Sequence, residues 1–120
     1  MSADPLVLVL PMPPNLANSR MHWRVKHREK LAYWLACDVA VKPPKPRAPL
    51  AKATMSSVMY LGAAMDTDNA MSRHKWALDY LTHRGWIEDD RRTCLTWTGF
   101  PEQVVKRDGN YRLVLTLKAA

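Results

Sequence analysis

Two short acidic stretches contain the residues of this chain best suited to chemistry. Asp66 and Asp68 stand one residue apart in "DTDN", and Asp89 and Asp90 are adjacent in "GWIEDD". If Asp66 ends an extended segment, Asp66 and Asp68 point to the same side, because strand side chains alternate with a period of two. Several ionised carboxylates in one place need a compensating cation, and oxygen ligands favour Mg²⁺ or Mn²⁺. These acids therefore predict a divalent-metal site.

The rest of the chain is strongly basic. Eighteen Lys and Arg against eleven Asp and Glu give a net charge of +7, which favours an anionic partner such as nucleic acid. In such a protein a carboxylate-bound metal suits phosphodiester cleavage, because it polarises the phosphate and lowers the pKa of the attacking water. Lys75 lies seven residues after Asp68, close to two helical turns, so both can project from one side of a helix.

Each of these residues also has a purely structural interpretation. Asp68 can be a helix N-cap, and Lys75 can be a solvated helix charge. The stretch "EDDR" is also ordinary composition for a surface turn. Their occurrence together in a basic chain favours the metal site, with Lys75 contacting the scissile phosphate.

A second candidate surface is basic and aromatic. The segment 20–30, "RMHWRVKHREK", interleaves five cations with two histidines and Trp23. We expect Trp23 to pack in the core, and stacking on an exposed base is the alternative. His74, next to Lys75, is expected to contact phosphate or solvent. The residues predicted to bind DNA are Arg20, Arg24, Lys26, Arg28, Lys30, Arg73 and Lys75.

Hydrophobic patterning predicts the elements that position these residues in a single domain, 1–120. Strands are expected at 6–10, which reads as buried on both faces, and at 54–62, 93–98 and 111–117, the last two flanking an "RDGN" hairpin signal. One helix is expected from an N-cap at Ser19 to about residue 42, with Leu31, Trp34, Leu35 and Val39 as its apolar stripe. A second is expected at 69–84, burying Met71, Ala77, Leu78 and Leu81 and ending at Gly85. The order β-α-β-α-β-β predicts a two-layer α+β fold, with a mixed β-sheet and both helices on it.

The cellular setting follows from the cysteines and the apolar run. Cys37 and Cys94 are too few and too isolated for a disulfide framework, which favours a reduced, cytoplasmic setting. The apolar run 6–10 is too short for a signal peptide or a membrane span, so we expect neither export nor a membrane partner.

Three motifs in order, "LPMPPNLANSR", "DTDN" and "GWIEDD", make the chain similar to the RusA family of Holliday junction resolvases. The resemblance covers almost the full length. It implies metal-binding aspartates at Asp66, Asp68 and Asp90, an assisting Asp89, and an essential lysine at Lys75. It also implies a homodimer that uses Mg²⁺ to make paired, symmetric nicks in four-way DNA junctions, in a bacterial or phage-infected cell.

The chain departs from the best-studied form of this family in two places. There the lysine follows D-x-D-N by one turn and arginines precede the motif, whereas here the lysine is two turns along and "LGAAM" precedes. The cluster at 20–30 would then take over the lost arginine contacts. Two other readings stay open: a non-cleaving module that binds branched DNA, and a phage factor whose basic surface meets an acidic host protein.

Overall fold

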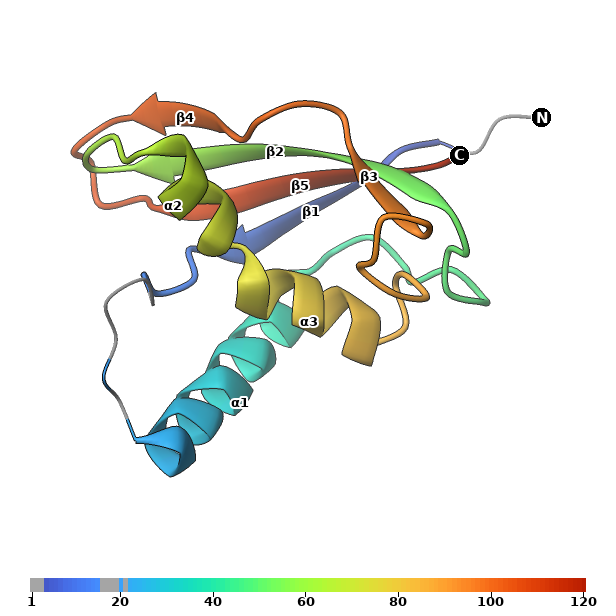
Figure 1. Ribbon diagram of the computed structural model, residues 1–120, viewed down its shortest axis with the longest axis horizontal. Helices are drawn as coiled ribbons and strands as arrows, with labels where there is room; N and C mark the ends of the chain where they lie inside the picture. Colours follow the sequence, from blue (N-terminus) through green and yellow to red (C-terminus); the bar gives the residue numbers. More distant parts are fainter. Residues whose placement is uncertain (1–3, 16–19, 21) are drawn as a thin grey trace.

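A five-stranded mixed β-sheet carries the helices against one of its faces (Figure 1). The computed structural model describes residues 4–15, 20 and 22–120. The strands are β1 (Leu6–Pro11), β2 (Ala53–Leu61), β3 (Leu95–Trp97), β4 (Glu102–Val105) and β5 (Arg112–Ala119). The helices are α1 (Trp23–Ala40), α2 (Thr67–Ser72) and α3 (Lys75–His83). The predicted α+β class with a mixed sheet is confirmed.

The C-terminal strand, β5, lies in the middle of the sheet. It pairs antiparallel with β1 on one side and with β2 on the other. The far edge of β2 pairs in parallel with two short strands, β3 along Ala53–Met55 and β4 along Val58–Leu61. The strand order is therefore β1-β5-β2, followed by β3 and β4 side by side along one edge.

The predicted hairpin around "RDGN" does not form. Gly109 has a φ of 75°, and the Asp108 carboxylate accepts a hydrogen bond from the Asn110 N–H at 3.0 Å, so a turn is present. However, β4 and β5 lie on opposite sides of β2 and do not pair with each other (Figure 1). Strand β4, which the sequence did not predict, occupies the edge position, and the turn only reverses the chain over the end of β2.

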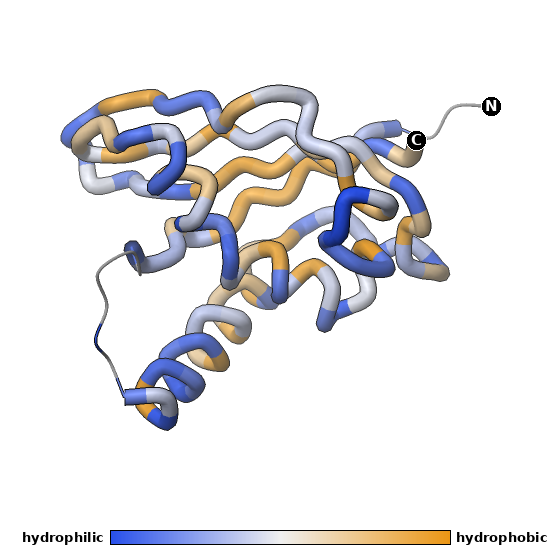
Figure 2. The backbone as a smooth tube through the Cα atoms, in the orientation of Figure 1, coloured by the Kyte–Doolittle hydropathy of each residue, from blue (hydrophilic) through white to orange (hydrophobic). Residues whose placement is uncertain are grey.

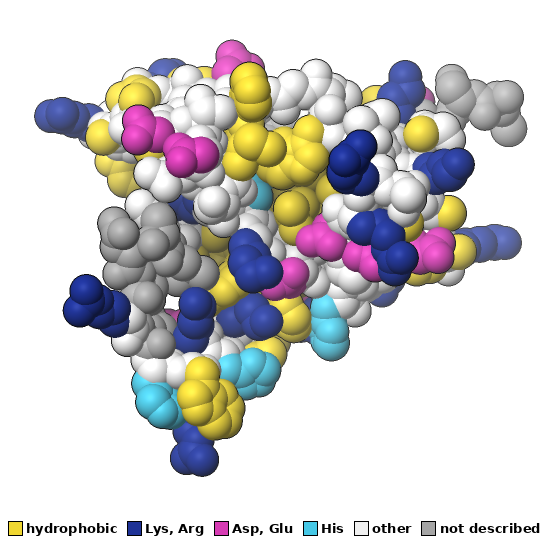
Figure 3. Space-filling view, in the orientation of Figure 1, with side chains coloured by type: hydrophobic (Ala, Val, Ile, Leu, Met, Phe, Trp, Pro, Cys, Tyr) yellow, Lys and Arg dark blue, Asp and Glu magenta, His cyan; other side chains and the backbone are white. Residues whose placement is uncertain are grey.

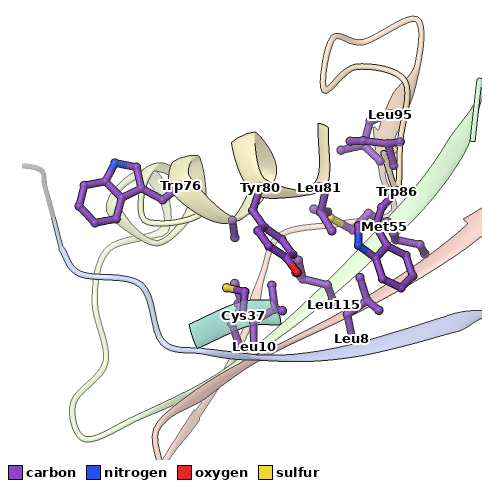
Figure 4. Close-up of a cluster of buried hydrophobic side chains, with 14 of the residues drawn as sticks. Leu8, Leu10, Cys37, Met55, Trp76, Tyr80, Leu81, Trp86, Leu95 and Leu115 are labelled. Carbon is purple, nitrogen blue, oxygen red and sulfur yellow. The ribbon is translucent and has the colours of Figure 1, made fainter. Parts of the chain in front are cut away.

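The core lies between one face of the sheet and the helices. Every second residue of the central strands is buried, and these side chains meet α1 and α3 in one cluster (Figure 4). Residues of high hydropathy accordingly concentrate in the strands of the sheet (Figure 2). Leu8 and Leu10 of β1 belong to this cluster, whereas Val7 and Val9 are exposed. The expectation that β1 is buried on both faces is wrong, because none of the described helices covers the second face of the sheet (Figure 1).

Helix α1 begins later and buries a different face than predicted. The His22 side chain caps it by accepting a hydrogen bond from the Arg24 N–H at 3.2 Å, and the predicted cap Ser19 lies outside the described residues. Trp34 is buried as expected, but the other members of the predicted stripe are exposed, Leu31 by 41%, Leu35 by 62% and Val39 by 87%.

Two aromatic residues determine which face of α1 is buried. The Tyr33 hydroxyl donates to the Pro11 carbonyl at 2.8 Å, and Trp34 Nε1 donates to the Trp76 carbonyl at 3.0 Å. Large rings whose polar ends find partners can be buried in full. The buried face is therefore formed by Tyr33, Trp34 and Cys37. The spacing of apolar residues in the sequence did not predict this face.

The second predicted helix is interrupted at Arg73 and His74. The His74 N–H bonds to Met71 at 3.1 Å, so the Ala70 carbonyl loses its usual backbone partner and accepts from His74 Nδ1 at 2.7 Å instead. Because Nδ1 therefore carries the proton, Nε2 accepts from the Ser57 hydroxyl of β2 at 2.6 Å. This fully buried side chain holds the break between α2 and α3 against the sheet.

The end of α3 follows the prediction. Gly85 adopts a φ of +80°, which favours glycine, directly after the helix. Ala77 and Leu81 are buried as expected, and Leu78 packs against the core only in part.

The two cysteines are both free thiols, and burial raises the pKa of the Cys37 thiol to about 12. In the part of the chain that the structure describes, no helix is long and apolar enough to cross a membrane.

Candidate functional site

Asp66 and Asp68 stand at the start of α2. Asp66 is the N-cap residue in extended conformation, but its side chain makes no capping hydrogen bond, and Asp68 belongs to the first helical turn. The predicted strand-like alternation is therefore wrong, because only Asp66 is extended. Both side chains are exposed, and neither forms an ion pair with any other described residue. The two carboxylates are thus available to a ligand.

Residues on either side of α2 hold it in place. The Gln103 side chain on β4 accepts from the Met65 N–H and donates to the Met65 carbonyl, both at 2.9 Å, which fixes the chain just before Asp66. After the helix, Arg73 Nε donates to the Pro13 carbonyl at 2.7 Å. Burial lowers the pKa of the Arg73 guanidinium. Arg73 was predicted to bind DNA, and in the structure it supports the proline-rich loop through Pro13.

The second acidic stretch has a different environment. Arg91 donates to Asp89 Oδ2 from Nη2 at 2.6 Å and from Nε at 2.9 Å, and this bond lowers the pKa of Asp89. Asp90 makes no ion pair with a described residue. Partial burial, followed by the negative charges of Asp89 and Asp79, raises the Asp90 pKa. Asp89 is therefore already paired with Arg91. Asp90 is an exposed carboxyl whose negative charge would be stabilised by a bound proton or cation.

The two acidic stretches are not gathered into one metal site within this chain. Outside residues 1–3, 16–19 and 21, no group of three or more His, Cys, Asp or Glu side chains is placed to hold a metal ion. Figure 1 shows the start of α2 and the loop that follows α3 at opposite ends of the α2–α3 pair. The metal site of Asp66, Asp68 and Asp90 stays a prediction, because the three carboxylates do not form one group within a single chain.

Lys75 opens α3 and faces a cavity of about 370 Å³ between α1 and α3. Asp68 lies in α2 and Lys75 lies in α3, with the helix break between them. The prediction that both side chains project from one side of a single helix is therefore wrong. One side of the cavity is lined by Trp23, Lys26, His27 and Lys30 of α1, and the other by Lys75, Trp76 and Asp79 of α3. Sequence reasoning did not single out Asp79, although its position one turn after Lys75 was a usable signal.

The predicted basic cluster divides around α1. Lys26 and Lys30 line the cavity, whereas Arg24 and Arg28 are exposed and do not. Arg20, also exposed, precedes the helix. In Figure 3, Lys and Arg side chains gather where α1 approaches the rest of the molecule, with histidines at the tip of α1. The cluster thus presents cations on more than one side of the helix.

Two aromatic predictions are wrong. Trp23, expected in the core, is 67% exposed, with the Arg24 guanidinium 5.2 Å from the centre of its ring. His74, expected to contact phosphate or solvent, is fully buried, and this burial lowers its pKa. Trp23 is therefore free to contact a ligand and His74 is not.

No protein-family model and no curated protein matches the chain. The likeness to the RusA family consequently depends on the three sequence motifs, and the function must be inferred from the residues of the site.

Proposed function

We propose that this protein is an Mg²⁺-dependent, structure-selective DNA endonuclease of the RusA type. It would resolve four-way junctions by paired, symmetric nicks during recombination and repair, as a homodimer in the cytoplasm of a bacterial or phage-infected cell. The main support is the pair of exposed carboxylates at the start of α2, Asp66 and Asp68, which have no cationic partner among the described residues of a protein with net charge +7. Adjacent acids without a counter-ion favour binding of a cation.

The donor set fits magnesium. Mg²⁺ is usually held by one or two carboxylates, and waters and substrate phosphate oxygens complete its coordination. Asp66 and Asp68 supply that number of carboxylates, and Mn²⁺ accepts the same oxygen ligands. When bound there, the metal would polarise the scissile phosphate and lower the pKa of the attacking water.

The protein side chains would orient the reacting groups. Gln103 fixes the backbone just before Asp66, so the start of the helix that carries the two carboxylates is held in place before DNA binds. Lys75 would contact the phosphate and neutralise charge on it, and the exposed cations of α1 would hold the flanking backbone. The position of Lys75 is set by packing, because the contacts of the buried His74 side chain place the start of α3.

A homodimer would account for Asp90. We infer that Asp90 from a second protomer joins Asp66 and Asp68, because one chain keeps the two stretches apart. The exposed apolar stripe of α1, Leu31, Leu35 and Val39, is a surface that association could cover. A two-fold axis would then produce two equivalent sites, as paired nicks require.

Substitution of Asp68 tests the endonuclease proposal. We expect Asp68→Asn to bind a synthetic four-way junction as tightly as the wild type and to lose Mg²⁺-dependent cleavage. Asp4→Asn is the matched control, since Asp4 is an exposed acid on the segment before β1. Cleavage on a denaturing gel at the wild-type rate by Asp68→Asn would show that the site is wrongly assigned.

Mixing two inactive variants tests the shared site. If Asp68 and Asp90 of different protomers form one site, a mixed dimer of Asp68→Asn and Asp90→Asn contains one intact site and nicks the junction on one strand. If each protomer builds its own site, the mixture stays inactive. Unmixed variants at the same total concentration are the control.

The alternative is a non-cleaving module for branched DNA. It is favoured by the lack of a three-ligand metal group among the residues that the structure describes. It predicts junction binding by the wild type with the same gel pattern with and without Mg²⁺, on a junction and on linear duplex of the same sequence.

A further inference from the structure

We propose that the cavity between α1 and α3 binds one unpaired nucleotide of a DNA strand. Its base would stack on Trp23, and its phosphates would contact Lys26, Lys30 and Lys75. The choice of DNA rests on the proposed function, but the cavity is separate from the carboxylates that would perform cleavage. Charge, exposed aromatic surface and size support this inference.

The cavity carries excess positive charge. Three lysines line it and Asp79 supplies one negative charge. The ion pairs among the residues that the structure describes are Arg84 with Asp38 and Arg91 with Asp89, and neither includes a cavity residue. Lys26 and Lys30 are partly buried, and the Lys30 ammonium lies 5.1 Å from the centre of the Trp34 ring. Three ammonium groups beside one carboxylate leave excess positive charge, which is unfavourable, and a bound anion relieves that repulsion.

The aromatic residues indicate that the anion also has a flat, apolar part. Trp23 lines the cavity and is 67% exposed in all, whereas Trp34, Trp76 and Trp86 are buried. An exposed indole beside cations is the usual partner of a nucleobase, because every base has a face that can stack. Inorganic phosphate would leave this surface unused.

The cavity size and Asp79 specify the ligand further. A volume of about 370 Å³ lies at the lower end of the range for small-molecule sites, about 300–1,000 Å³, so the cavity suits a ligand the size of one nucleotide. The Asp79 carboxylate repels phosphate and accepts hydrogen bonds from a base amino group. Phosphates are thereby directed to the lysines and the base edge to Asp79. Extruding a base costs least where its stacking is already interrupted, as it is at a strand branch point, so the cavity would distinguish branched DNA from continuous duplex.

The binding experiment uses DNA labelled at the branch. A four-way junction with one unpaired 2-aminopurine at its centre, and a linear duplex of the same sequence, are titrated with protein in EDTA so that nothing is cut. We expect Trp23→Ala to weaken junction binding about 5- to 100-fold and to leave duplex binding unchanged. Trp23→Phe should restore most of the affinity. Phe100→Ala, which removes another exposed aromatic side chain (76% exposed) outside the cavity, should have no effect.

A second pair of variants tests the phosphate contacts. Lys26→Gln should reduce the slope of log affinity against log salt by about 0.7 on the junction, the value for one contact to a single strand. Lys118→Gln, which changes an exposed lysine of β5 outside the cavity, should leave the slope unchanged. Free deoxyadenosine monophosphate should compete poorly, because it provides one phosphate in place of a strand.

The outcomes separate this inference from the endonuclease proposal. Equal losses for Trp23→Ala and Phe100→Ala, equal losses on junction and duplex, or tighter binding of the free nucleotide than of the strand would each overturn it. If the wild type binds with the expected Trp23 dependence but never cuts with Mg²⁺, the endonuclease proposal fails and the cavity assignment stands. If it cuts and Trp23→Ala binds normally, only the cavity assignment fails.

Discussion

Acidification below about pH 6.5 should destabilise the folded protein through His74. This side chain is fully buried, its Nδ1 donates to Ala70 at 2.7 Å, and its Nε2 accepts from Ser57 at 2.6 Å. That pattern needs the neutral ring, because a charged ring has two donors and no acceptor. Burial lowers the His74 pKa from 6.5, and the positive charge of Arg73 acts in the same direction.

The sign and size of the effect follow from proton linkage. Between the unfolded pKa of 6.5 and the lower folded pKa, the unfolded chain binds more protons, so stability is complete above 6.5 and falls as the pH falls. The slope cannot exceed about 1.4 kcal/mol per pH unit, so the loss between pH 6.5 and pH 5.5 is at most about 1 kcal/mol. For a chain of 120 residues this corresponds to a loss of about 3–6 °C in Tm. Asp38 contributes in a separate window, because its pKa lies below 3.8.

Urea unfolding at about pH 7.5, 6.5 and 5.5 measures this dependence. His74→Asn should be less stable at neutral pH and should lose the pH dependence, whereas His27→Asn, which changes an exposed histidine, should keep it. If His74→Asn does not fold, NMR titration of the His74 ring in the wild type gives its pKa directly. A free energy of unfolding that is constant from pH 7.5 to 5.5, or a His74 pKa at or above 6.5, would refute the reasoning.

Three further predictions concern a helix end, a support of the site and a surface ion pair. Gly85→Ala should cost about 1 kcal/mol in urea unfolding because of the positive φ, whereas Gly99→Ala, whose new Cβ meets no atom within 4 Å, should be neutral. Gln103→Ala should slow junction cleavage about 10- to 100-fold with little change in binding, measured by single-turnover kinetics, because the chain before the α2 carboxylates loses both side-chain bonds. Asp38→Asn should cost no more than about 1 kcal/mol, and less in high salt, because the ion pair with Arg84 is partly exposed; an equal cost at low and high salt would contradict this.

The parts of the fold that sequence patterning predicted are those set by local periodicity. Strands β1, β2 and β5 have long apolar or alternating patterns, and Gly85 marks the end of α3 by a backbone requirement. Strand β4, "EQVV", has four residues and no such pattern, because its place depends on a free edge of β2. The break at His74 depends on Ser57, 17 residues earlier, and no local pattern reveals that contact.

The candidate site shows the same division. The motifs identified the carboxylates of Asp66, Asp68 and Asp90, but their separation depends on how α2 and α3 run past the sheet (Figure 1). The spacing of Leu31, Leu35 and Val39 resembles a buried stripe, yet tertiary hydrogen bonds turned a different face of α1 inward and left Trp23 exposed beside the cavity. Interactions between distant segments therefore explain why the buried face of α1 and the exposure of Trp23 were predicted wrongly.

The central place of β5 has a consequence for synthesis on the ribosome. β1 and β2 each pair with β5 and not with each other, so neither strand has its main neighbour until the last segment of this sequence has emerged. Non-local pairings of this kind form slowly, and unpaired strand edges invite association between chains. β1 and β2 therefore stay without their shared neighbour until residues 112–119 arrive, and the pairing of this segment commits the polypeptide to its native sheet.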